Sequence, residues 1–108
     1  MAHATAAYRL NPEMHEFLGA GIIRLIVRGE NVIGHYGRRG YLTGALHGRM
    51  LTATLRDGVR DGEVQLTFDV EFNCFEGYYL KGPSEKPDML PISGNRITRR
   101  RSIDAPGS

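Results

Sequence analysis

Histidine and cysteine side chains are the groups in this sequence that could hold a metal ion or carry out nucleophilic chemistry. The candidates are His15, His35, His47 and Cys74, and no two of them show the close spacing of a structural zinc site. A reactive cysteine needs a basic, partly exposed setting, and nothing in the sequence around Cys74 indicates one. We therefore predict no metal site, no cofactor and no catalytic residue.

The carboxylates between residues 57 and 76 follow the spacing of strand and turn positions that face solvent. Glycoside hydrolysis requires two carboxyl groups on opposite sides of a cleft. Alternation along a strand explains Glu63 and Asp69 without a cleft. Catalysis therefore ranks below the two binding hypotheses given at the end of this section. It would take the form of a small hydrolase or isomerase with its site in the mouth of a β-barrel.

Tyrosines are candidates for ligand or partner binding. Tyrosine combines an apolar ring with a polar hydroxyl, which suits pocket rims and interfaces. The candidate binding residues are Tyr36, Tyr41, Tyr78 and Tyr79. The same residues could instead complete the core of a chain that has no tryptophan.

Arginines near the end of the chain are candidates for nucleic-acid binding through phosphate contacts. They are Arg96, Arg99, Arg100 and Arg101. Residues 1–95 contain 10 Lys and Arg against 11 Asp and Glu, so the formal net charge of +2 comes from this terminal cluster. A solvated tail is the alternative interpretation of the same residues.

The stretch from residue 21 to residue 80 alternates apolar and polar residues between glycine-containing turns, which indicates β-strands. These strands must position most of the candidate side chains. The pattern predicts an all-β fold: a six-stranded antiparallel meander over 21–28, 32–36, 41–46, 50–56, 63–70 and 75–80. Gly34, Gly44 and Gly77 fall inside these strands, where they favour sharp bending or a bulky neighbour lying across the backbone. We expect the sheet to curl into a small barrel or half-barrel.

The sequence predicts one domain with four parts. Residues 1–20 are a lead-in in which the sequence predicts a short helix that starts at Asn11 and Pro12 and stops at Gly19, with an irregular segment as the alternative. The meander occupies 21–80, a segment containing proline and glycine packs on it over 81–94, and an arginine-rich flexible tail occupies 95–108. The single cysteine excludes an internal disulfide, and the sequence shows neither a signal peptide nor a membrane-spanning run, so we expect a cytoplasmic protein without a membrane partner.

The runs GHYGRRGYLTGALHGRMLTATLRDG, GEVQLTF and FEGYYLKG resemble the meander of avidin-like and lipocalin-like small bacterial barrels, over roughly residues 25 to 80. The resemblance implies a fold and no ligand residues, because the chain lacks the tryptophans of avidins and the early Gly-x-Trp motif of lipocalins. DGVRDGEVQLTF and FEGYYLKG also resemble MORN-type repeats, whose fixed period the sequence does not sustain.

We therefore expect a non-enzymatic barrel-like module that self-associates and binds a protein partner or a small apolar ligand. An accessory protein that binds nucleic acid through the arginine-rich tail is the alternative. Ile22 and Ile26 face away from the other aliphatic residues of the first predicted strand, which would be an open edge of the meander. They are the predicted interface of a homo-oligomer, most simply a dimer.

Overall fold

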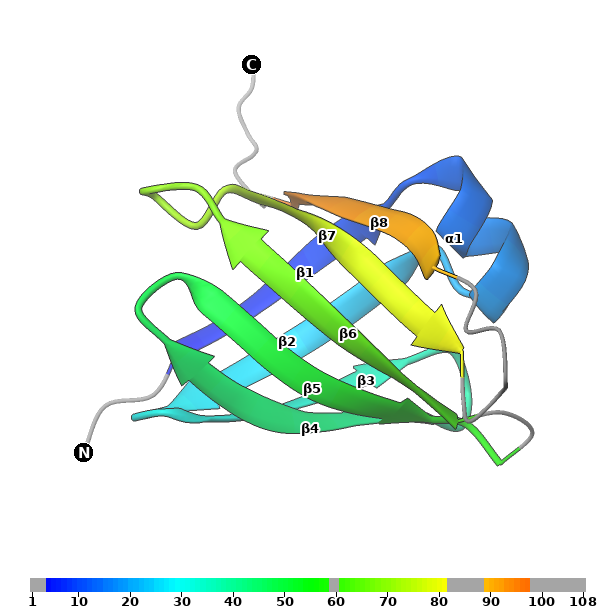
Figure 1. Ribbon diagram of the computed structural model, residues 1–108, viewed down its shortest axis with the longest axis horizontal. Helices are drawn as coiled ribbons and strands as arrows, with labels where there is room; N and C mark the ends of the chain where they lie inside the picture. Colours follow the sequence, from blue (N-terminus) through cyan, green and yellow to red (C-terminus); the bar gives the residue numbers. More distant parts are fainter. Residues whose placement is uncertain (1–3, 59–60, 82–88, 98–108) are drawn as a thin grey trace, which may run out of the picture.

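The computed structural model describes residues 4–58, 61–81 and 89–97, which form eight strands and one helix. In chain order they are β1 (Ala4–Leu10), α1 (Pro12–Leu18), β2 (Ile22–Arg28), β3 (Asn31–Tyr36), β4 (Gly40–His47), β5 (Met50–Arg56), β6 (Asp61–Phe68), β7 (Cys74–Lys81) and β8 (Met89–Arg96). Each strand pairs antiparallel with its neighbours in sequence, and β8 pairs with β1 (Figure 1). The sheet is therefore a closed up-and-down barrel.

The prediction of an antiparallel all-β meander that curls into a barrel is confirmed, whereas its count of six strands is wrong. β1 lies in the segment expected to be a lead-in, and β8 includes residues 89–94 of the proline- and glycine-containing segment that was expected only to pack on the meander. In β1 the alternation is weak because three of its seven positions are alanines, Ala4, Ala6 and Ala7. Residues 82–88, the remainder of the predicted proline- and glycine-containing segment, lie outside the described residues.

β8 forms in spite of Pro91 and Gly94, and side chains distant in sequence contact the strand at both places. The Asn11 amide donates to the Pro91 carbonyl at 3.3 Å, and the Asn11 side-chain oxygen accepts from the Ser93 N–H at 3.0 Å. Asn11, which lies between the end of β1 and the start of α1, thus hydrogen-bonds the backbone of β8. The ring of Phe75 lies where a Cβ on Gly94 would stand, so only glycine fits under that ring.

The helix prediction is confirmed. Pro12 occupies the first turn of α1, and Gly19 ends the helix with a φ of 70°, its N–H donating to the His15 carbonyl at 3.0 Å. Asn11 holds the cap position, although its side chain bonds β8 and makes no capping bond to α1. Met14 and Leu18 are buried against one end of the barrel, which α1 covers (Figure 1).

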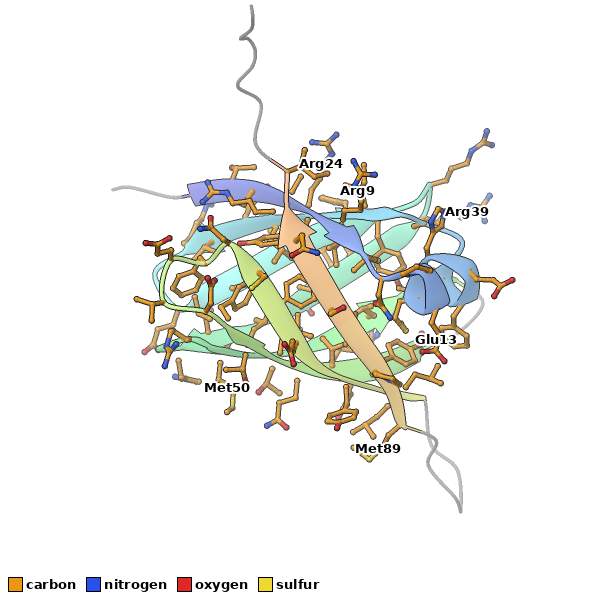
Figure 2. The ribbon with its side chains drawn as sticks, turned by 90° about the horizontal axis from the view of Figure 1, so that it is seen from above. Arg9, Glu13, Arg24, Arg39, Met50 and Met89 are labelled. Atoms are coloured by element: carbon orange, nitrogen blue, oxygen red, sulfur yellow. The ribbon has the colours of Figure 1, made fainter. Side chains whose placement is uncertain are left out.

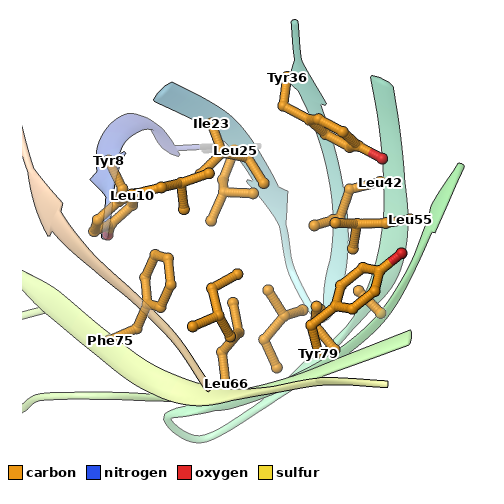
Figure 3. Packing of buried hydrophobic residues seen from close by; sticks show 14 of the residues in the cluster. Tyr8, Leu10, Ile23, Leu25, Tyr36, Leu42, Leu55, Leu66, Phe75 and Tyr79 are labelled. Carbon is orange, nitrogen blue, oxygen red and sulfur yellow. The ribbon is translucent and has the colours of Figure 1, made fainter. Parts of the chain in front are cut away.

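The interior is lined by the alternate residues of all eight strands. Its buried aliphatic and aromatic side chains form one cluster that also includes Met14, Leu18 and Ala20. Tyr36 and Tyr79 project into it from facing walls (Figure 3). The Tyr79 ring lies over Gly62, and the Phe75 ring lies over Gly94. A Cβ atom at either position would collide with the ring, which explains why both residues are glycine.

One strand boundary was predicted wrongly. The strand expected over 63–70, with Val70 inside, ends at Phe68, and Val70 is 77% exposed. The chain leaves the sheet there because the Asp69 carboxylate accepts from the backbone N–H of Asn73 at 2.7 Å and of Cys74 at 3.0 Å. These bonds fold residues 69–73 into a tight turn between β6 and β7.

Candidate ligand-binding cavity

An apolar cavity of about 260 Å³ lies inside the barrel at the end opposite α1. Its walls come from β1 to β6, β8 and the β6–β7 turn near this end. The lining residues are Thr5, Ala6, Tyr8, Leu25, Val27, Val32, Leu46, Leu51, Phe68, Phe72 and Arg96. Space remains beside β1 because Ala6, its inward-facing residue there, has a small side chain, whereas Thr5 pairs with Ile26 and is exposed at the edge of the cavity.

Phe72 covers part of this cavity from the β6–β7 turn. Its φ of 60° is the left-handed conformation that bulky residues rarely adopt, and no other non-glycine residue among those described has a positive φ. Its ring stacks on Phe68, with centroids 5.0 Å apart and planes 27° apart. Holding a phenylalanine in this conformation costs about 1–3 kcal/mol, which the rest of the turn must offset.

Tyr8 links the cavity wall to this turn. Its hydroxyl donates to the Phe72 carbonyl at 2.7 Å, and its ring contacts Phe68 and Phe75 at centroid distances of 5.6 and 5.2 Å. Burial raises the pKa of the Tyr8 phenol above its ordinary value, while the positive charge of Arg96 opposes the rise. The hydroxyl therefore stays protonated and keeps donating to the turn.

Arg96 lies at the cavity and not in a tail. Asn95 and Arg96 belong to β8, the Arg96 N–H donates to the Asn73 carbonyl at 2.7 Å, and the Ile97 N–H donates to the Ala7 carbonyl at 2.8 Å. The predicted tail that starts at residue 95 is wrong for these three residues. Arg99, Arg100 and Arg101 lie outside the described residues.

The four predicted tyrosines do not gather at one site. Tyr36 and Tyr79 are buried inside the barrel, whereas Tyr41 and Tyr78 are 42% and 51% exposed on its outer surface. The residues that do surround the cavity include Tyr8, Phe68 and Phe72. Nothing in the sequence indicated Phe72, because the position of Phe72 depends on the turn at residues 69–73.

Ile22 and Ile26 were predicted as interface residues partly because their strand was expected to be an open edge of the sheet. That expectation is wrong, because β2 pairs with β1 on one side and β3 on the other. Both side chains nevertheless face outward from β2; Ile22 is 36% exposed and Ile26 is half-buried. A dimer through these residues stays a prediction, and sedimentation of an Ile22→Lys variant against the wild type tests it.

The residues with metal or acid–base chemistry are dispersed. Among the described residues no group of three or more His, Cys, Asp or Glu could hold a metal ion. His47 lies 3.7 Å from Glu30 on the surface, and Cys74 is a free, half-buried thiol at the start of β7. No helix within the described ranges has the length and apolar character needed to cross a membrane.

Comparison with known proteins gives no match: no protein-family model, curated protein or solved structure is similar to this chain. The resemblance to avidin-like and lipocalin-like barrels therefore remains a hypothesis.

Proposed function

We propose that this protein is a non-enzymatic binding barrel that takes a small apolar ligand into the cavity at its uncovered end. The observation that carries the proposal is the apolar space of about 260 Å³ between Leu25, Leu51 and Phe68. Ligand sites are typically concave and apolar, with a few polar groups that orient the ligand. The arrangement of eight up-and-down strands around an interior site is also that of lipocalins.

The size of the cavity sets the class of ligand. Drug-sized ligands occupy cavities of roughly 300–1,000 Å³, and 260 Å³ is just below that range. The ligand we propose is thus a short alkyl chain or a compound with one or two rings. Arg96 pairs with the inward-facing Tyr8 and supplies the charged group at the rim, which would orient a carboxylate or hydroxyl on such a molecule.

A pair of alanines in β1 provides the test. Ala6 faces the cavity and is partly buried against the core, whereas Ala7 pairs with Arg24 and faces the other side of the sheet. Binding is measured by calorimetry and by the rise in melting temperature with a panel of short- and medium-chain fatty acids and aromatic acids. We expect saturable binding to the wild type, at least a tenfold loss in Ala6→Leu and unchanged affinity in Ala7→Leu.

Two outcomes contradict the proposal. Equal binding to wild type and Ala6→Leu would place the ligand elsewhere on the protein. The absence of saturable binding by every member of the panel, with the barrel folded, would show that the cavity is a packing defect and not a site.

A further inference from the structure

The outer surface of the barrel carries its charges unevenly. The five strands β1 to β5 contain no aspartate or glutamate but contain four arginines: Arg9, Arg24, Arg28 and Arg56. β6 and β7 carry the acidic strand residues Asp61, Glu63 and Glu76. Figure 2 shows Arg9, Arg24 and Arg39 along one side of the barrel; Met50, which begins β5, lies along the opposite side with Met89. We refer to β1 to β5, whose charged strand residues are all arginines, as the basic half of the sheet.

The register of the sheet places four residues of this basic half side by side. Arg24 pairs with His35, His35 with Tyr41, and Tyr41 with Arg56, so they form one row across β2 to β5. All four side chains are exposed. The rings of His35 and Tyr41 meet edge to face, with centroids 5.5 Å apart and planes at 60°. We refer to these four residues as the Arg24–Arg56 row.

A row with a guanidinium at each end and two exposed rings between them offers the groups that bind single-stranded nucleic acid. Neighbouring strands are about 4.8 Å apart, so three strand spacings separate the two arginines by about 14 Å. Guanidinium groups pair with phosphates, and exposed aromatic rings stack on bases. A duplex hides its base faces and an acidic peptide has none, so the rings favour an unpaired strand.

From this geometry we infer that the Arg24–Arg56 row is a binding site for single-stranded nucleic acid. The site is on the outside of the barrel and shares no residue with the cavity, so the inference does not depend on the proposed function. It also differs from binding through Arg99, Arg100 and Arg101. Asp61 pairs with Arg56 across β5 and β6, so the acidic strands bound the row there. The nucleic acid would extend the other way, toward Arg9 on β1.

The test measures fluorescence anisotropy of a labelled oligothymidylate with the full chain at several salt concentrations. Arg24→Gln and Arg56→Gln should each weaken binding several-fold and reduce the slope of log K against log salt by about 0.7. Tyr41→Ala should weaken binding about tenfold with the slope unchanged, because it removes stacking and no charge. Arg28→Gln is the matched control, since Arg28 is an exposed arginine on β2 outside the row. It should change affinity less than about twofold.

Four results would overturn the inference. Equal losses in Arg28→Gln and Arg24→Gln would show diffuse charge attraction. Unchanged affinity in all row variants would place binding elsewhere, the terminal arginines included. A duplex or inorganic polyphosphate bound as tightly, with Tyr41→Ala silent, would indicate a general polyanion surface. The absence of binding to the folded wild type at low salt would show that the row is no site for nucleic acid. Circular dichroism of each variant confirms that the barrel is intact.

Discussion

The two ends of this barrel are built from the same eight strands but are filled differently. At the end covered by α1, Met14 and Leu18 from the helix and the large rings of Tyr36 and Tyr79 pack into the interior. At the other end, the inward residue of β1 is the small Ala6, no helix among the described residues covers the barrel, and the cavity of about 260 Å³ remains. The difference indicates that one end supplies stability while the other has space for a ligand.

Truncation of Tyr79 should give the largest effect on stability. Tyr79 is 1% exposed, contacts the Phe17 ring of α1 at 5.2 Å and lies over Gly62. Tyr79→Ala should lower the free energy of unfolding by about 3–5 kcal/mol, as other large buried aromatic truncations do. Urea denaturation measures this loss. Phe72→Ala at the uncovered end is the comparison and should cost only about 1 kcal/mol, because Phe72 is half-buried and mainly stacks on Phe68. Equal losses would show that both ends are equally packed.

Replacing an alanine by leucine should have opposite effects on stability at a tightly packed core position and at the cavity wall. Ala53 is 4% exposed and packed beside Gly44, so Ala53→Leu has no room and should destabilise by about 1–3 kcal/mol. Ala6→Leu extends into the cavity and should be neutral or stabilising by up to about 1 kcal/mol. Melting temperatures of the two variants give the signs. A clear loss of stability in Ala6→Leu would mean that the cavity wall cannot accept a larger side chain.

The Asp69 carboxylate should account for much of the order of the turn at the uncovered end. It accepts from two backbone N–H groups, of Asn73 and Cys74. Asp69→Ala should cost about 1–2 kcal/mol, because hydrogen bonds to a charged acceptor contribute about 1.5–3 kcal/mol and water replaces part of them. Asp69→Asn keeps an acceptor and should recover part of the loss. Amide hydrogen exchange at residues 72–74 should accelerate in Asp69→Ala, and unchanged exchange would show that the turn is held by other contacts.

Much of the fold was predictable because period-two alternation and glycine turns are local signals. The inward faces of β5 and β6 follow directly from the alternation of residues such as Leu51 and Leu66. β8 was not predictable, since Pro91 and Gly94 are poor strand residues and the contacts of this strand with Asn11 and Phe75 come from residues distant in sequence.

The cavity could not be predicted from the sequence either, for a different physical reason. It depends on which end α1 covers and on the left-handed conformation of Phe72, and neither has a residue pattern of its own. The outer Arg24–Arg56 row was missed because each strand contributes only one of its four members. Side-by-side placement across strands appears only once the register is known.

Tyr8 should give the smallest effect on stability and the one that depends on pH. Tyr8→Phe removes the hydrogen bond to the Phe72 carbonyl and should cost about 1 kcal/mol near neutral pH. Burial raises the pKa of the folded-state phenol from 10.0, so above about pH 10 the unfolded chain loses this proton first. The unfolded state then binds fewer protons, and the contribution of Tyr8 to stability falls as pH rises. The difference between wild type and Tyr8→Phe, from urea denaturation at pH values from about 7 to about 11, should therefore shrink at the alkaline end. A difference that stays constant over this range would mean that the Tyr8 phenol titrates alike in the folded and unfolded chains, and a difference near zero at pH 7 would mean that its hydrogen bond to Phe72 contributes nothing.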